Sequence, residues 1–535
     1  MRPFLTLHHP ALARDFYRDG LWTGDSFYAL ALQHAQHRPN ALALRDAANQ
    51  WTWAEVVQRA DAFAAELSAA GLKPGDRVSL WLGNHAAAVV AFIACSRGGY
   101  ACNPSLHRTF TNAETKTLLE RLGSAALITE PGWGADAAAQ ALVTSLRQAP
   151  GMRAVYADPD SLPEVVAGAL PSRADDPDAV TYMAFTSGTT GPPKCVMHST
   201  NTLMANARDM ARDWGLSHKT CLLSLSPLSH HIAWVGVSQW LFTGCVFCTD
   251  DPLAGMDRLD WIIETGATYV MGVPTHALDV LSLQRKRGVK HLGDVRMFYM
   301  AGSPIPPSVA EAFLAQGIKP QNVYGMTENS SHQYTHPDDD DDIATATCGR
   351  GGPAYRTKIF DPANTDVEQP IGVAGEIGGR GAALMLGYYA NQAETAGSFN
   401  HDGWFLSGDL GSIDEFGHLT VSGRSKDLIV RGGHNIHPAH IEALALRHPE
   451  LDKVAVFPVS DERLGEKVCI AVVGTMEVET LLAFLDQQGL SRYDKPEYFL
   501  RLDAFPLTSS GKVLKRKLVA DLRAGKLTPE PIARA

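Results

Sequence analysis

This sequence lacks an excess of positive charge, because 58 Asp and Glu residues outnumber 47 Lys and Arg residues and leave a net charge of −11. A basic field that would attract nucleic acid or an anionic membrane is therefore not expected. Long apolar runs are also missing, since AAAVVAFIAC at 86–95 is far shorter than the roughly 20 residues that span a bilayer. The amino terminus shows no charged start followed by a sustained apolar stretch. These absences predict a cytoplasmic protein without a membrane span.

Cysteine is sparse, with eight residues in 535, which predicts free thiols in a reducing compartment rather than a disulfide framework. The pair Cys245 and Cys248 has no second CxxC or matching His pair, so CVFC is interpreted as a buried strand. The acidic run 338–342 lacks the glycine and distal glutamate of a calcium loop and is interpreted as a solvated loop. The length of the chain predicts at least two domains.

Gly, Ser and Thr dominate the stretch FTSGTTGPPK at 185–194. A loop of small residues exposes backbone N–H groups and hydroxyls, which suits an anion with several oxygens, most obviously a polyphosphate. The P-loop template does not apply, because Pro192 and Pro193 donate no N–H before Lys194. Cys195 also stands where a magnesium-binding hydroxyl would be needed.

Short apolar runs alternate with amphipathic stretches from about residue 180. AVTYMAF, TCLLSLS, CVFC, ATYVMGV and VRMFYMAG are typical of strands, and NTLMANARDMARDW, MDRLDWIIET and PSVAEAFLAQG of helices. This alternation predicts a largely parallel sheet covered by helices, with ligands beyond the carboxyl ends of the strands. After about residue 355, Gly-punctuated segments predict antiparallel strands, and a compact α+β pattern follows a boundary at about residue 424.

Six segments, in order and approximate spacing, resemble the core motifs of the adenylate-forming superfamily: YMAFTSGTTGPPK, PLSHH, NVYGMTE, GWFLSGDLG, SGRSKDLIVRGGHNIHP and PLTSSGKVLKRKL. This superfamily contains acyl-CoA synthetases, aryl-CoA ligases, peptide-synthetase adenylation domains and firefly luciferase, and the resemblance covers essentially the whole chain. It implies an α/β protein with a large N-terminal domain (1–423) of helix-covered, largely parallel sheets plus a small β-barrel-like part. A hinge (424–427) and a small mobile C-terminal α+β domain (428–535) are implied to follow.

The resemblance also implies ATP, Mg²⁺ and coenzyme A as cofactors. The β- and γ-phosphates of ATP would be bound by hydroxyls and a lysine in the loop that contains Thr186, Ser187, Gly188, Thr189, Thr190 and Lys194. Glu328 resembles the magnesium ligand, a hard oxygen donor. Asp409 resembles the carboxylate that accepts the ribose hydroxyls, and Arg424 a second ribose or phosphate contact. Adenine would lie against Tyr324, with Gly302, Ser303, Pro304, Asn322, Gly325 and Thr327 completing the nucleotide site.

Other motif residues are implied to act in catalysis, in thiol binding and at the hinge. Lys512 resembles the mobile adenylation lysine and is predicted to be catalytic together with Thr186, Glu328 and His230. His230 matches the histidine between acyl pocket and thiol tunnel, where a base role and a gating role stay open, as does an exchange of roles with His231. Gly432 and Gly433 resemble the glycine pair along which pantetheine slides. The next residue is His434, where many relatives carry Glu. Lys426 stands at the hinge position of the family.

The implied reaction is that of an acid–thiol ligase, an AMP-forming acyl-CoA synthetase. A carboxylate would attack the α-phosphate of MgATP to give acyl-AMP and pyrophosphate, and the CoA thiol would then displace AMP. Alternatives are transfer to a carrier-protein pantetheine or an amine, luciferase-like oxygenation, and a nucleotide-binding protein without turnover. Intact Lys512, Glu328 and Asp409 disfavour the last.

The acyl pocket implied by these motifs is mostly apolar and has no cationic residue, which disfavours dicarboxylates. The substrate predicted is a small-to-medium aliphatic, alicyclic or aryl carboxylic acid. Trp234 is expected to line the acyl site. The sequence leaves open whether the protein is a homo-oligomer. The pocket candidates are His230, Ile232, Ala233, Trp234, Val235, Val273, Ala301, Met326 and Asn329.

Overall fold

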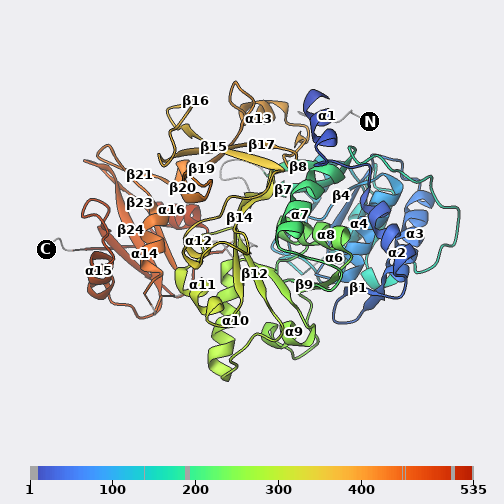
Figure 1. Ribbon diagram of the computed structural model, residues 1–535, viewed down its shortest axis with the longest axis horizontal. Coiled ribbons are helices and arrows are strands. Elements are labelled where there is room, and N and C mark those ends of the chain that lie inside the picture. Colours follow the sequence, from blue (N-terminus) through green and yellow to red (C-terminus); the bar gives the residue numbers. More distant parts are fainter. Residues whose placement is uncertain are drawn as a thin grey trace.

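The computed structural model describes residues 10–137, 139–186, 193–448, 450–451, 453–507 and 513–532. Two large sheets with their helices make up most of the molecule, and a small sheet with helices forms the end that contains the carboxyl terminus (Figure 1). The predicted fold class, a large N-terminal α/β part followed by a small C-terminal α+β domain, is confirmed.

The first large sheet has seven strands in the order β18-β8-β7-β4-β3-β5-β6. Strands β7, β4, β3, β5 and β6 run parallel, whereas β8 is antiparallel to both β7 and β18. The predicted strand AVTYMAF is β7. The strands are β3 Arg77–Trp81, β4 Ala101–Asn103, β5 Ser124–Thr129, β6 Ala154–Tyr156, β7 Val180–Thr186, β8 Lys194–Ser199 and β18 Gly387–Tyr388.

The second large sheet has eight strands in the order β14-β13-β12-β11-β9-β10-β1-β2. Only the edge strands β2 and β14 pair antiparallel, so this sheet too is largely parallel. CVFC lies largely in β10, where Cys248 is fully buried. The strands are β1 Leu42–Arg45, β2 Gln50–Thr52, β9 Cys221–Ser224, β10 Val246–Thr249, β11 Tyr269–Gly272, β12 Met297–Ala301, β13 Lys319–Met326 and β14 Ser330–Tyr334.

A layer of helices separates the two large sheets. One hydrophobic core joins α4 (Ala86–Gly98), α7 (Thr200–Asp213) and α8 (His231–Thr243) to strands of both sheets. The longest apolar run forms most of α4, and this helix is buried on every side, which explains why it is hydrophobic all round. A capping box fixes the start of α7, because the Ser199 side chain accepts from the Thr202 N–H at 3.2 Å.

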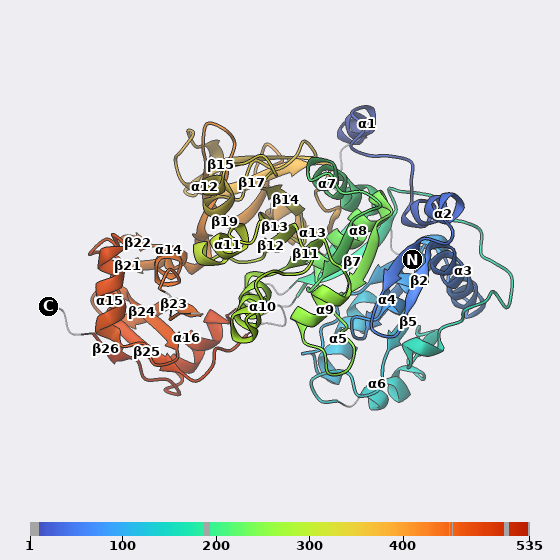
Figure 2. The same ribbon diagram turned by 60° about the horizontal axis from the view of Figure 1, so that its bottom comes forward.

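The remaining helices cover the outer faces of the sheets or connect their strands (Figures 1 and 2). They include α5 and α6 over the seven-stranded sheet, and α9, α10 and α11 over the eight-stranded sheet. Their bounds are α1 Pro10–Arg18, α2 Phe27–His37, α3 Trp53–Ala69, α5 Asn112–Leu122, α6 Ala139–Leu146, η1 Pro159–Ser161, α9 Arg258–Glu264, α10 Pro274–Arg287, α11 Pro307–Leu314, α12 Asp341–Ala346 and α13 Gln392–Gly397.

The small β-barrel-like part takes the form of a five-stranded antiparallel sheet, ordered β16-β15-β17-β19-β20. Its glycines allow close packing, since a Cβ on Gly379 would lie 2.2 Å from the Tyr355 ring. The strands are β15 Tyr355–Asp361, β16 Asn364–Glu368, β17 Gly375–Gly381, β19 Phe405–Ile413 and β20 Leu419–Arg424.

The C-terminal domain begins after a short connection at the predicted hinge. Strand β20 ends at Arg424, the 3₁₀ turn η2 spans Ser425–Asp427, and β21 begins at Ile429 in a different sheet. The motion of this domain stays a prediction. Its elements are β21 Ile429–Arg431, β22 His434–Ile436, α14 Pro438–Ala445, β23 Val454–Asp461, β24 Gly465–Val473, α15 Val478–Gln487, β25 Tyr498–Leu502, α16 Lys515–Arg523 and β26 Glu530–Pro531.

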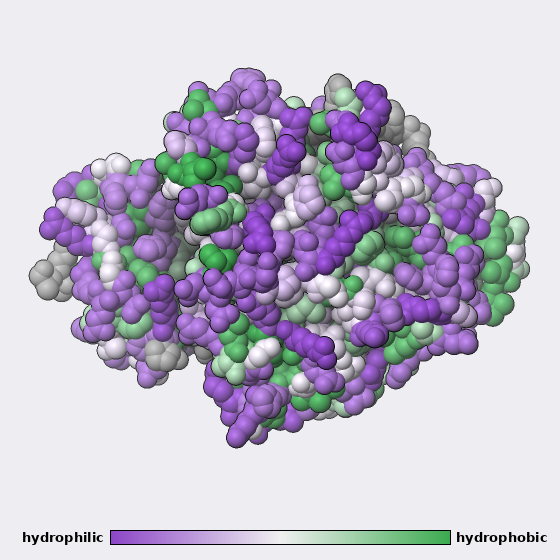
Figure 3. All heavy atoms as spheres, viewed as in Figure 1, coloured by the Kyte–Doolittle hydropathy of each residue, from purple (hydrophilic) through white to green (hydrophobic). Residues whose placement is uncertain are grey.

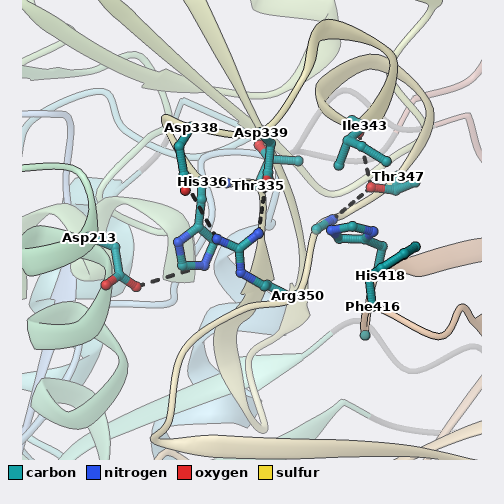
Figure 4. A network of polar contacts seen from close by, with 12 residues as sticks. Asp213, Thr335, His336, Asp338, Asp339, Ile343, Thr347, Arg350, Phe416 and His418 are labelled. Atoms are coloured by element: carbon teal, nitrogen blue, oxygen red, sulfur yellow. Dashed lines mark hydrogen bonds and ion pairs between the residues drawn. The ribbon is translucent and has the colours of Figure 1, made fainter.

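The acidic run 338–342 is only partly the solvated loop that its composition predicted (Figure 4). Asp339 is buried, and it accepts hydrogen bonds from the His336 N–H and from Arg350 Nη1, both at 2.7 Å. The interpretation is wrong for this residue, because a nearby guanidinium compensates the burial of its charge. The other four aspartates are exposed, and Asp340 precedes α12 as its N-cap.

The face of the molecule in Figure 3 is mostly hydrophilic, with hydrophobic residues scattered across it. No helix in the described part of the chain is both long enough and apolar enough to cross a membrane. All eight cysteines carry free thiols.

Candidate active site

Three predicted nucleotide-binding residues meet where β13 faces the five-stranded sheet. Asp409 of β19 and Arg424 of β20 are direct partners across the antiparallel pair, and Arg424 Nε lies 3.0 Å from Asp409 Oδ1. The Tyr324 hydroxyl donates to the other Asp409 oxygen at 2.8 Å. Burial and the Asp409 charge raise the pKa of Tyr324 well above its ordinary value, so it remains a neutral donor. Asp409 is thus a buried, oriented acceptor.

A tight turn after β13 positions Glu328. A Cβ on Gly325 would lie 1.8 Å from the Ser330 carbonyl oxygen, so only glycine fits there. Ser330 itself has a φ of +58°, a left-handed conformation that is costly for a residue with a Cβ. Asn329 Oδ1 accepts from the Met326 N–H at 3.0 Å and closes the turn. The strained Ser330 thus lies two residues after Glu328, at the end of the same turn.

The Glu328 carboxylate is buried and accepts a hydrogen bond from a tyrosine hydroxyl. Its Oε1 accepts from the Tyr388 hydroxyl at 2.9 Å, and its backbone carbonyl accepts from the Met385 N–H at 2.7 Å. Burial raises the pKa of Glu328, whereas the Tyr388 hydrogen bond and the charge of Lys194 lower it. A buried carboxylate whose ionised form is disfavoured fits an added cation, and its hard oxygens fit Mg²⁺.

The predicted phosphate loop joins β7 to β8. Thr186 at the end of β7 pairs with Lys194 at the start of β8. Lys194 forms an ion pair with Glu394, and its Nζ lies 4.8 Å from the centre of the Tyr388 ring. Ser187, Gly188, Thr189 and Thr190 lie outside the described residues.

The predicted histidine, His230, precedes α8 as its N-cap. Its ring stacks on that of His107, with centroids 4.4 Å apart and planes inclined by 24°. His107 Nδ1 lies 3.0 Å from the Ser229 hydroxyl, and burial lowers the pKa of His107 to about 4. His107 therefore stays neutral at neutral pH, and the His230 ring stacks on an uncharged imidazole.

His231 lies between the two large sheets rather than beside His107. Its Nδ1 is 3.2 Å from the Tyr182 hydroxyl on β7, and its Nε2 is 3.2 Å from the Ser330 hydroxyl on β14. Burial, and then the neighbouring His198, lower the pKa of His231 well below its ordinary value. His198 in turn has Nε2 2.6 Å from the Thr327 carbonyl, to which it donates. These histidines support the turn that carries Glu328.

The apolar pocket candidates belong largely to the central core. Trp234 is 1% exposed, packs against Phe92 at 4.5 Å between ring centroids, and donates its indole N–H to the Leu228 carbonyl at 2.6 Å. These contacts place the indole in the core layer that joins the two sheets. The buried candidates are Ala233, Trp234, Val235, Val273, Ala301 and Asn329, and those with partial exposure are His230, Ile232 and Met326.

The remaining predicted site residues lie on the strand ends and in the C-terminal domain. Gly302, Ser303 and Pro304 follow β12, whereas Asn322 lies in β13. Gly432 and Gly433 form the β21–β22 turn with φ of +58° and +87°, which favours glycine. The neighbouring His434 lies 2.8 Å from Asp494. Lys426 is in η2, and Lys512 lies outside the described residues.

Tyr388 and Glu394 were not predicted from the sequence. Tyr388 lies about 60 residues from its partner Glu328, and Glu394 lies about 200 residues from its partner Lys194. Both occur in GYYANQAET, a segment whose Gly-Tyr pair and acidic residue follow the Gly-rich strands. A polar segment directly after glycine-rich strands indicates a loop that can carry functional residues, and this was the sequence signal for Tyr388 and Glu394. His198, Tyr182 and His107 had no such signal, because isolated polar residues within apolar runs are usually structural.

Comparisons with known proteins agree with this arrangement. The AMP-binding enzyme family matches residues 32–389, and the AMP-binding enzyme C-terminal domain matches residues 440–512. The chain is 28% identical to the medium-chain fatty-acid–CoA ligase of Escherichia coli, over 97% of this chain and 94% of the relative. It is 32% identical to a salicylyl-CoA synthase / salicylate adenylyltransferase from a Streptomyces species, over 97% of each.

Solved structures give the same result. ATP-bound MatB from Rhodopseudomonas palustris superposes with a TM-score of 0.83 at 27% identity, covering 93% of this chain and 99% of that one. The o-succinylbenzoate CoA synthetase MenE from Bacillus subtilis, in complex with its acyl-adenylate, has a TM-score of 0.79 at 25% identity, covering 91% and 97%. The chain therefore belongs to the AMP-binding enzyme family, the adenylate-forming superfamily that its motifs predicted, and it is an enzyme of the AMP-forming acyl-CoA synthetase class.

Proposed function

We propose that this enzyme joins a small-to-medium aliphatic, alicyclic or aryl monocarboxylic acid to coenzyme A through an acyl-AMP intermediate. The observation that carries this proposal is the pair of buried carboxylates, Glu328 and Asp409, each held by a tyrosine hydroxyl. Glu328 lies in the turn between β13 and β14, Asp409 lies in β19 of the five-stranded sheet, and the charge of Asp409 contributes to the raised pKa of Glu328. Such a pair suits a ligand that brings hydroxyl donors to one carboxylate and a cation to the other.

In the first step, the nucleotide would be oriented by residues of β13, β19 and β20. Asp409 would accept the ribose hydroxyls, with Arg424 beside it and Tyr324 against the base. Glu328 would hold Mg²⁺, which supplies positive charge to the phosphate oxygens when bound. Lys194, with the hydroxyl of Thr186, would bind the outer phosphates. Lys512 would stabilise the charge that develops as the acid attacks the α-phosphate.

The acid would bind beside the N-terminus of α8, near His230 and Ile232. The histidines there carry little positive charge at neutral pH, because burial lowers the pKa of both His107 and His231. An uncharged, mainly apolar site favours a single carboxylate on an apolar or aryl group. The medium-chain and salicylyl-CoA relatives act on acids of this general size and polarity by their names.

For the second step, coenzyme A is the proposed acceptor. The names of the medium-chain and feruloyl relatives are those of CoA ligases. The glycine turn at Gly432 and Gly433 leaves room for a narrow pantetheine chain, since neither residue carries a Cβ. His434 takes the next position, where it is bound to Asp494.

A panel of carboxylic acids tests this function. The enzyme would be incubated with MgATP, CoA and one acid at a time, while pyrophosphate release and thioester mass are measured. We expect thioesters from medium-chain aliphatic or aryl monocarboxylic acids, and little product from dicarboxylates of equal length. Acid-dependent pyrophosphate release without a CoA thioester would favour a carrier-protein or amine acceptor, and absence of any acid-dependent release would refute the proposal.

A further inference from the structure

The phosphate-loop lysine has a protein carboxylate as its partner. Lys194 Nζ pairs with Glu394 of α13, and it also lies over the Tyr388 ring at 4.8 Å. The Lys194 and Glu394 side chains are 26% and 42% exposed, so the pair borders solvent. The hydroxyl of the same tyrosine donates to Glu328. Tyr388 thus contacts both Lys194 and Glu328, and the charge of Lys194 also lowers the pKa of Glu328.

Local structure holds Glu394 in place opposite β8. The Asn391 side chain caps α13 by accepting from the Glu394 N–H at 3.3 Å. The Tyr388 N–H donates to the Thr395 hydroxyl at 3.0 Å, which ties α13 to β18. Strand β18 pairs directly with β8, the strand that begins at Lys194. The ion pair is therefore fixed by hydrogen bonds from both sides, although its partners are 200 residues apart.

A polyphosphate at this loop must compete with Glu394 for the same ammonium group. The three N–H donors of Lys194 could reach Glu394 and a phosphate oxygen together, but the two anions would then share one positive charge and repel each other. Because an ammonium is a point charge with freely rotating donors, it can exchange between two anionic partners without moving the backbone. By this argument the ion pair with Glu394 would weaken phosphate binding at Lys194.

We propose that Glu394 is a positioning residue that competes with phosphate for Lys194 and thereby promotes the release of pyrophosphate. This inference rests on the proposed function, in which Lys194 binds the outer phosphates of ATP. The Lys194–Glu394 pair borders solvent, and an ion pair of that kind changes the equilibrium in which it takes part by about two- to fivefold. The equilibrium here is the dissociation of pyrophosphate. Removing the Glu394 charge should therefore tighten pyrophosphate binding by that factor, and should do so only while Lys194 is present.

A double-mutant cycle with magnesium pyrophosphate as the probe tests this role. Dissociation constants would be measured by calorimetry for wild type, Glu394→Gln, Lys194→Ala and the double variant. Glu415→Gln is the matched control, because it removes one negative charge from the exposed turn between β19 and β20. Melting temperatures would verify folding of every variant.

We expect Glu394→Gln to bind pyrophosphate about two- to fivefold more tightly, and to be inhibited by pyrophosphate at correspondingly lower concentrations. Glu415→Gln should match wild type, and Glu394→Gln should change nothing in the Lys194→Ala background. Unchanged or weaker binding in Glu394→Gln, or equal tightening in both backgrounds, would overturn the inference while leaving the proposed function intact. Wild-type affinity in Lys194→Ala would instead refute the phosphate-binding role of this lysine, and with it the site assignment beneath both proposals.

Discussion

Replacing Tyr388 by Phe would remove a single hydroxyl from the site and retain the ring beneath Lys194. That hydroxyl donates to Glu328 at 2.9 Å. Burial raises the pKa of Glu328, and the hydrogen bond from Tyr388 opposes this rise. The variant should therefore raise the pKa of Glu328 further, because the ionised form gains more from a donor than the neutral form does.

The size of this change follows from the strength of a hydrogen bond to a charged group, roughly 1.5–3 kcal/mol. Since one pKa unit corresponds to about 1.36 kcal/mol, the pKa of Glu328 should rise by about one to two units. A carboxyl with a higher pKa is less ionised at any given pH near that value. The acidic limb of the pH profile for adenylation should consequently move to higher pH by about one to two units, and half-saturation should need more magnesium.

The assay is the initial rate of pyrophosphate release at saturating ATP and acid, from about pH 5.5 to about pH 9 and at several magnesium concentrations. Tyr156→Phe is the control, because its buried hydroxyl has no hydrogen-bond partner among the described residues and lies outside the site. It should leave the profile unchanged. An acidic limb of Tyr388→Phe that coincides with that of wild type, with unchanged magnesium dependence, would refute the role assigned to Glu328.

Four further predictions concern the turn, the C-terminal lysine, the core and the buried histidines. Gly325→Ala should abolish adenylation, because its Cβ would lie 1.8 Å from the Ser330 carbonyl oxygen, whereas the control Gly168→Ala should match wild type. Equal activity of the two variants would contradict the tight backbone contact at Gly325. Lys512→Ala should reduce adenylation by about 10² or more while thioester formation from supplied acyl-AMP persists, and equal loss in both half-reactions would contradict this. Trp234→Ala should lower the free energy of unfolding by about 3–5 kcal/mol in denaturant titrations, because the indole is buried. Unchanged stability would contradict this, and an altered preference among acids would support the predicted place of Trp234 at the acyl site. Stability should fall as pH falls from about 6.5 towards 4, because unfolded His107 binds a proton that the native residue, with a pKa of about 4, does not; a His107→Gln variant with the same pH dependence as wild type would exclude this residue as a cause.

The order of strands and helices could be predicted because hydrophobic periodicity is local. AVTYMAF, CVFC and VRMFYMAG became β7, β10 and β12 as their apolar character predicted. The layering of two sheets around α4, α7 and α8 could not be predicted, because a uniformly apolar helix does not indicate which surfaces bury it. Composition likewise misassigned Asp339, whose burial depends on an arginine eleven residues away.

Individual site contacts were predictable only where a motif kept its residues close together. Gly325 at the end of β13 and Glu328 in the turn after it are three residues apart, so their segment could be singled out from the sequence. Tyr388 and Glu394 come from a distant segment, and only the pairing of β18 with β8 brings them to Lys194. The contact between Trp234 and Phe92 was also beyond prediction, because the two residues are far apart in the sequence; the place of Trp234 at the acyl site stays a prediction.

The transfer of isotope from the acid to the nucleotide is a direct test of the acyl-AMP intermediate. An acid that supports thioester formation would be prepared with ¹⁸O in its carboxylate and incubated with MgATP and CoA, and the nucleotide product analysed by mass spectrometry. Attack of the carboxylate on the α-phosphate leaves one carboxylate oxygen on phosphorus when the thiol displaces the nucleotide. We expect AMP carrying one ¹⁸O atom for each thioester formed, and unlabelled AMP, or ADP as the product, would contradict attack of the acid on the α-phosphate.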